Sequence, residues 1–301
     1  AVAMVLWASG VQAQFLYPLP EVEDIVTLNE VDQTAYETAD DQKFIYTDTD
    51  IDGNTNNHYL LWQIKKDITR SERVTNNHGV PITGNFIGLN LVNNGNSGAA
   101  VFINYDDSGN DISGNFIGNY VENSFAYGGA IGIAYNVGNV RGNFFNNHVL
   151  STSNTAFGGV AQFIGVGNIS GNFIGNYARS LNGSAYAGVF TYDEHMGYIP
   201  ENQDITGNFI GNYTHGKTDA YAGVVMVHGD PYNNFHHRFV NVKFLHNYAR
   251  ADDLDGKAYG GAIVYNGFTS VIADGGISEF TGNYAQVGLQ KNSNAIYGYG
   301  T

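Results

Sequence analysis

The chain of 301 residues has no cysteine and only 5 prolines. Without cysteine, disulfide bonds and thiolate zinc sites are excluded, so stability depends on burial and on backbone hydrogen bonds. Proline lacks the amide hydrogen that strand pairing needs, and its scarcity therefore permits long runs of regular sheet. Beyond the N-terminus, no apolar stretch is long enough to span a bilayer as a helix.

Basic residues are also scarce, with 13 Lys and Arg against 28 Asp and Glu, which gives a formal net charge of −15. Nucleic acid and anionic lipid surfaces are bound through clustered Lys and Arg, so the charge argues against both as partners. The chain is instead rich in Gly (39), Tyr (21) and Phe (18). This composition indicates many short strands and tight turns around a narrow aromatic interior.

The first residues are apolar and end in a small-x-small sequence, Val11-Gln12-Ala13. This pattern is typical of a secretory signal peptide cleaved after Ala13, here without an initiating Met and hence trimmed at its start. The alternative is a buried first strand or helix of the mature fold. The first interpretation predicts an extracellular or bacterial cell-surface protein, and a cysteine-free composition suits such export.

A seven-residue phrase, Gly-Asn-Phe-Ile-Gly-Asn-Tyr, recurs along the chain and indicates a repeat protein. Complete copies are Gly114–Tyr120, Gly171–Tyr177 and Gly207–Tyr213, and weaker copies begin at Gly84, Gly142, Val242 and Ser278. The repeated Phe lies at positions 86, 116, 144, 173, 209, 244 and 280. The spacing is 28–30 residues in the early units and 35–36 in the later ones, where insertions lengthen the unit.

Each unit also holds a pair of small residues followed by an apolar run. Two columns of this run are apolar, and the position between them has no common character, as on a strand with one buried face. The first column is Val101, Ile131, Ala161, Phe190, Val225 and Ile263, and the second is Ile103, Ile133, Phe163, Tyr192, Val227 and Tyr265. Helical repeats are excluded because glycine pairs every dozen residues would destabilise short helices.

Two strands per coil are thus expected, with a third from the short stretches before each phrase, such as 109–113. The sequence therefore predicts an all-β fold, a right-handed parallel β-helix of about seven coils over residues 82–301. Residues 14–81 do not contain the repeat and have a different, partly acidic composition. They are predicted to form a non-repeat N-terminal cap.

An asparagine follows the repeated Phe by three residues in six of the seven units. Asparagine tolerates tight turns and can stack amide on amide along successive coils, so a structural role is favoured over a flat recognition array. The column is Asn119, Asn147, Asn176, Asn212, Asn247 and Asn283; in the first unit, Leu89 takes this place.

The alternation of Gly-Gly-Ala-Ile with Phe-x-x-Asn resembles the repeats of chlamydial-type polymorphic outer-membrane proteins and, more widely, β-helical autotransporter passengers. The resemblance covers about residues 82–301 and implies a surface adhesin or structural passenger. It also implies a membrane β-barrel, its own or a partner's, and no strand run of that kind is present in this chain. We therefore expect either a fragment of a longer autotransporter or export by another route.

Before the repeats, Asp48, Asp50, Asp52 and Asn54 stand in a D-x-D-x-D-G pattern in which alternate side chains converge on one calcium ion. The twelfth position is Tyr59 rather than the expected Glu, and no helix flanks the loop. Calcium is thus a candidate cofactor, and a solvated Asp/Asn/Gly turn is the alternative.

Two insertions follow the apolar strand in adjacent units, at 193–204 and 228–238. Stacking would place both on one edge and bring together a set that could bind a divalent metal or a glycan. The set is Asp193, Glu194, His195, His228, Asp230, His236 and His237. Ordinary polar surface loops are the alternative, because solenoids accommodate insertions at turns.

Taken together, these features predict a secreted or surface-displayed bacterial adhesin or structural passenger. It would bind a host or environmental receptor or glycan, without catalysis and without a nucleic-acid partner. A β-helical polysaccharide lyase or glycoside hydrolase is the alternative, because such enzymes share the fold.

Overall fold

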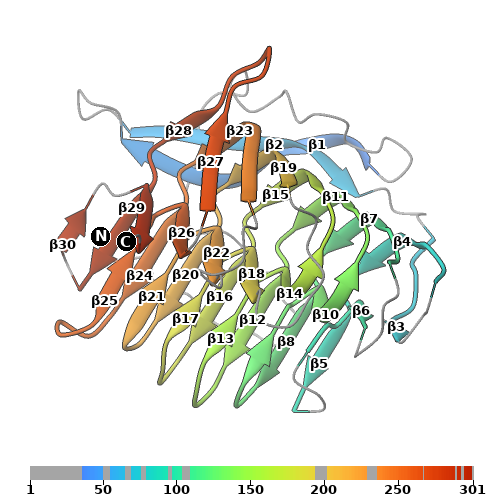
Figure 1. Cartoon of the computed structure of the whole chain (residues 1–301), viewed down its shortest axis with the longest axis horizontal. Helices are drawn as coiled ribbons and strands as arrows, with labels where there is room; N and C mark the ends of the chain where they lie inside the picture. Colours follow the sequence, from blue (N-terminus) through green and yellow to red (C-terminus); the bar gives the residue numbers. More distant parts are fainter. Residues whose placement is uncertain are drawn as a thin grey trace. The chain divides into compact units, whose positions relative to one another are not determined.

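The computed structural model describes residues 36–49, 55–64, 69–75, 79–93, 97–103, 109–193, 202–228, 236–266, 268–288, 290–292 and 295–299. Every regular element among them is a β-strand (Figure 1). None of these residues forms a helix that could cross a membrane. The predicted signal peptide, residues 1–13, lies outside the described residues, as does much of the predicted cap.

The chain divides into two compact units, Ala1–Ile68 and Thr69–Thr301. In the first, β1 (Tyr36–Thr49) and β2 (Thr55–Ile64) form an antiparallel hairpin. The hairpin pairs Tyr36 with Ile64 at its open end and Thr49 with Thr55 next to the turn.

The second unit is a right-handed parallel β-helix of about six turns, as the repeat predicted, with one coil fewer than expected. Its strands form four sheets, which we call walls 1 to 4 in the order in which the chain visits them. Strands of successive coils lie side by side along each wall (Figure 1). The division after Ile68 places residues 69–81 with the coils.

Wall 1 contains the strands of the seven-residue phrase. They are β4 (Ile82–Ile87), β7 (Ile112–Ile117), β11 (Val140–Phe145), β15 (Ile169–Ile174), β19 (Asn202–Ile210) and β23 (His236–Leu245), followed by β27 (Phe268–Ile272) and β28 (Glu279–Thr281), which both pair with β23.

Wall 2 follows immediately after the phrase and begins with its tyrosine. Its strands are β5 (Asn90–Val92), β8 (Tyr120–Asn123), β12 (His148–Ser151), β16 (Tyr177–Ser180), β20 (Tyr213–Gly216), β24 (Tyr248–Ala251), β29 (Tyr284–Val287) and the antiparallel β30 (Gln290–Asn292).

Wall 3 is the narrowest. Its strands are β9 (Ala126–Tyr127), β13 (Ala156–Phe157), β17 (Ala185–Tyr186), β21 (Asp219–Tyr221) and β25 (Lys257–Tyr259).

Wall 4 contains the apolar run that follows the pair of small residues. Its strands are β3 (Val74–Thr75), β6 (Val101–Phe102), β10 (Ile131–Val137), β14 (Ala161–Val166), β18 (Phe190–Asp193), β22 (Val225–His228), β26 (Ile263–Asn266) and β31 (Ile296–Tyr299).

The predicted third strand is wrong in position. The stretch 109–113 supplies Ile112, but Ile112 begins the same wall 1 strand that holds Phe116, and both side chains point inward and are buried. The extra walls come instead from Tyr120 onward and from Ala126 onward. The five coils that contribute to wall 3 thus have four short strands rather than three, separated by tight corners such as that at Gly118 (φ +61°).

The core is built from columns of identical residues. The repeated phenylalanines stack with ring centroids 4.7–4.9 Å apart from one coil to the next, close to the spacing of paired strands. One predicted column needs correction, because β10 has a register shift between Ile131 and Ile133. Ala134 therefore takes the place beside Phe163 that was expected for Ile133.

The asparagine column is a buried hydrogen-bonded ladder, as expected. Each amide nitrogen donates to the amide oxygen of the next asparagine and to a Phe carbonyl of the preceding coil. Asn176 Nδ2, for example, donates to Asn212 Oδ1 at 3.0 Å and to Phe144 O at 2.8 Å. At the first rung Leu89 offers only its backbone N–H, which donates to Asn119 Oδ1.

Candidate functional site

Asp193 and His228, two of the predicted binding residues, lie on adjacent rungs of wall 4. They are paired in register at the ends of β18 and β22, and Asn266 continues the same row on β26. Asp193 is partly exposed and His228 is exposed. Glu194, His195 and Asp230 follow these strands in the sequence and lie outside the described residues. Of the predicted binding residues in and beside these two strands, the structure therefore locates only Asp193 and His228.

The chain returns from both insertions into wall 1, where His236 begins β23 opposite Asn202. His236 is partly exposed, whereas the next residue, His237, faces the interior with 1% of its surface exposed. The predicted set is therefore divided. Asp193 and His228 share an edge, while His237 belongs to the core.

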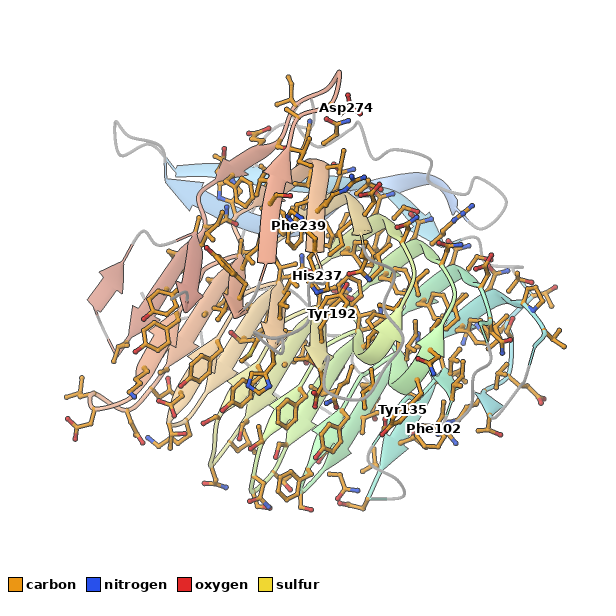
Figure 2. The ribbon with its side chains drawn as sticks, in the orientation of Figure 1. Phe102, Tyr135, Tyr192, His237, Phe239 and Asp274 are labelled. Carbon is orange, nitrogen blue, oxygen red and sulfur yellow. The ribbon has the colours of Figure 1, made fainter. Side chains whose placement is uncertain are left out.

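His237 is held in a small polar cluster inside the β-helix. Its Nδ1 hydrogen-bonds Gln203 Oε1, and its ring lies 4.9 Å from that of Tyr192 (Figure 2). Gln203 in turn donates from Nε2 to the carbonyls of Val166 and Gly167, at 3.1 and 2.7 Å. Because the Gln203 amide nitrogen is used in this way, its oxygen faces the ring, and His237 Nδ1 is the donor. The cluster lies in the interior of the later coils, which are longer than the early ones.

On the outer side of the same strands, Arg238 and Asp204 form a two-point ion pair. Arg238 Nε lies 2.7 Å from Asp204 Oδ1, and Nη2 lies 2.9 Å from Oδ2. The hydrogen bonds that Arg238 donates to Asp204, together with the negative charge of that carboxylate, raise the pKa of Arg238. The pair joins β19 to β23 at the point where the chain re-enters wall 1 after the insertions.

The predicted calcium ligands fall at the turn of the hairpin. Asp48 lies near the end of β1, with Asn56 of β2 as its partner in register. Asp50, Asp52 and Asn54 lie outside the described residues. Among the residues that are described, no group of three or more His, Asp or Glu side chains is arranged to hold a metal ion.

Sequence reasoning missed two columns of aromatic side chains on the outer faces of walls 2 and 3. They alternate with inward residues that are fully buried, such as Val121 and Ala126, and most of the rings are partly exposed. The wall 2 ladder is Tyr120, His148, Tyr177, Tyr213, Tyr248 and Tyr284. The wall 3 ladder is Tyr127, Phe157, Tyr186, Tyr221 and Tyr259, with Tyr297 stacked on its end.

The rings of the wall 2 ladder stack face to face, as do those of the wall 3 ladder as far as Tyr221, whereas Tyr259 is tilted by 41° against Tyr221. Centroids in the wall 2 ladder are 4.5–5.2 Å apart and neighbouring planes differ by at most 8°. From Tyr127 to Tyr221 in the wall 3 ladder the spacing is 4.9–5.1 Å, with angles of 1–12°. Ring faces within the stack are therefore covered by neighbours, so the exposed parts of the ladders are ring edges and hydroxyl groups. The signal in the sequence was the tyrosine that ends each phrase.

His148 replaces tyrosine in the wall 2 ladder, between the rings of Tyr120 and Tyr177 at 5.0 and 4.5 Å. Burial lowers the pKa of His148 to about 4, although its contact with the carbonyl of Asn146 acts in the opposite direction. The imidazole is therefore neutral at neutral pH and stacks without a charge.

Acid is expected to destabilise the protein through His148. The unfolded chain takes up this proton near pH 6.5, before the folded chain does, so stability present above pH 6.5 is lost as pH falls toward 4. The loss should be about 1–2 kcal/mol, less than the whole pKa shift implies, because the ring is not fully enclosed. Urea unfolding at pH 7.5 and 4.5 measures it, and His148→Tyr should remove that part. An equal pH effect in both proteins would contradict this assignment.

Beside the wall 2 ladder runs a second outward row, whose middle rungs are basic: Arg179, His215 and Arg250. His215 Nε2 lies 3.0 Å and Arg250 Nη2 lies 3.2 Å from Asp252 Oδ1. Burial lowers the pKa of His215, against the effect of Asp252. Burial also disfavours the charge on Asp252, but His215 and Arg250 outweigh it and lower the pKa of that carboxyl.

The chain matches no family model, and neither a curated protein nor a solved structure resembles it closely enough to count as a match.

Proposed function

We propose that the protein acts by binding, as a secreted or surface-displayed adhesin whose contact surface is formed by the outer faces of walls 2 and 3. The observation that carries this proposal is the pair of continuous aromatic ladders on these faces. Tyrosine and arginine are enriched in the parts of protein interfaces that contribute most to affinity. Here aromatic rings, mostly tyrosines, recur on successive rungs in fixed register, and Arg179 and Arg250 lie two rungs apart in the adjoining row.

The construction of these walls favours binding further. Rings inside each ladder are stacked between two neighbours, which restricts their rotamers and leaves little side-chain entropy to be lost when a partner binds. Repeated units at a constant spacing also let several weak contacts act together on one extended partner. The resemblance to surface passengers and the signal-like N-terminus support display outside the cell.

A carbohydrate-active enzyme is the second candidate. The observation in its favour is that Asp193 and His228 lie side by side at the ends of β18 and β22. A carboxylate and an imidazole on one edge of a sheet can serve acid–base chemistry. These two residues form only part of such a site, whereas the ladders extend from β8 to β29 on wall 2 and over all five strands of wall 3. Binding is therefore the better supported function.

The test is retention of the purified chain on host-cell surfaces and on immobilised glycans, with product release measured in the same samples. We expect retention without cleavage. Tyr186→Ser, in the middle of the wall 3 ladder, should weaken retention by about tenfold. The matched control is Tyr135→Ser, a partly exposed tyrosine on wall 4, which should change it by less than about twofold. Cleavage of a glycan without retention would contradict the adhesin and favour the enzyme.

A further inference from the structure

The outer face of wall 2 is unusual in this acidic chain because three consecutive rungs of one row are basic. Arg179 is on β16, His215 on β20 and Arg250 on β24, and each pairs with the next in register. The row begins near a negative charge, since Glu122 lies two rungs before Arg179. The basic part is thus short and confined to the middle of the wall.

The two arginines differ in their surroundings. Arg250 shares Asp252 with His215, so part of its charge is already balanced. Arg179 is partly exposed, and none of the described carboxylates lies within ion-pairing distance of it. With two arginines, one aspartate and a neutral histidine, this cluster retains one net positive charge. A planar guanidinium of this kind suits a carboxylate, which it can bind through two parallel hydrogen bonds.

The spacing of the charges selects a kind of ligand. Arg179 and Arg250 are two rungs apart, roughly 10 Å at the usual strand separation. An extended polysaccharide advances by nearly one strand spacing per sugar, so a polymer with a carboxylate on every second sugar presents its charges at the same interval. The adjoining ladder supplies hydroxyl groups and ring edges to the sugars between.

We propose that the outer face of wall 2 binds an extended polysaccharide in which uronic acid alternates with a neutral sugar, with Arg179 holding a carboxylate. The proposal rests on the binding function proposed above and names its ligand class. A single cluster with one net positive charge suits a sparsely charged polymer better than a nucleic acid. A nucleic acid would require a longer basic surface, because affinity for it depends on many phosphate contacts.

The probe is an oligosaccharide of alternating glucuronic acid and N-acetylglucosamine, titrated against the full chain at low salt. Arg179→Gln should weaken binding about tenfold, because it removes a guanidinium that none of the described carboxylates balances. Asp252→Asn should tighten binding about threefold, because it removes the competing carboxylate. The matched control is Arg141→Gln, which removes the same charge from an exposed position on wall 1 and should change affinity by less than about twofold.

Unchanged affinity in Arg179→Gln, with folding verified by circular dichroism and thermal unfolding, would overturn the proposal. Equal affinity for neutral dextran, or tighter binding of single-stranded DNA, would overturn it as well. Retention on cell surfaces together with no binding of the oligosaccharide would refute the ligand while the adhesin function stands. If the chain is retained on no surface and no glycan, the proposed function fails too.

Discussion

Gly114→Ala is expected to destabilise the protein by about 4 kcal/mol or more, among the largest effects of a single methyl group. Gly114 has φ +131°, which L residues rarely adopt, and a Cβ there would lie 2.1 Å from the carbonyl oxygen of Gly84 in the preceding coil. The carbonyl belongs to the wall 1 ladder and pairs in register, so it has no freedom to move aside. The clash must be relieved by breaking strand pairing.

Gly118, in the same phrase, provides the matched control. It also has a positive φ, +61°, but a Cβ there would meet nothing within 4 Å. Gly118→Ala should therefore cost only about 1–2 kcal/mol, the conformational penalty alone. The free energy of unfolding from urea titrations, followed by circular dichroism, separates the two. Similar losses in both variants would show that backbone conformation, and not the close approach of coils, makes glycine necessary.

Asn176→Ala is expected to have the second large effect and to lower the free energy of unfolding by about 4 kcal/mol. The Asn176 side chain lies in the middle of the buried ladder, where its Oδ1 accepts from the backbone N–H and the amide of Asn147. Its Nδ2 donates to Phe144 O and Asn212 Oδ1. Removing it leaves several buried polar groups without a partner, at about 1–3 kcal/mol each before relaxation.

Asn182→Ala is the control for this change. Asn182 is exposed and donates a single hydrogen bond, to the carbonyl of Thr152 at 2.7 Å. Its replacement should cost less than about 0.5 kcal/mol, because water takes over the freed groups. Thermal unfolding of both variants and of the unchanged protein measures the difference. A loss of less than about 1 kcal/mol for Asn176→Ala would mean that the ladder is dispensable once the phenylalanines are stacked.

The fold could be predicted because the same residue types recur at each rung. Stacking places residue i of one coil on its counterpart in the next, so a column in the sequence is a column in space. The Phe and Asn columns therefore revealed the core and the amide ladder directly. Leu89 departs from the column for the same reason, and it ends the ladder of described asparagines, since its N–H donates to Asn119 Oδ1 while its side chain has no amide.

The candidate site could be predicted only in part. Stacking of adjacent coils was expected to bring the two insertions to one edge, and Asp193 and His228, where the insertions begin, pair in register. His237 was expected on the surface loop, but the strand β23 begins at His236 and alternation turns His237 inward onto Gln203. A side chain at an insertion boundary changes face with a shift of one residue, and the sequence does not reveal where the strand resumes.

The sequence by itself determined that this is a β-helix whose phrase combines a core phenylalanine, corner glycines and a ladder asparagine. Because the phrase repeats, identical residues of successive coils stack on one another. Only the tertiary structure decided the number of walls, the register shift at Ile131 and the facing of each tyrosine. The reason is that corners and bulges depend on how neighbouring coils fit together, while the pattern within one coil shows only that its residues alternate.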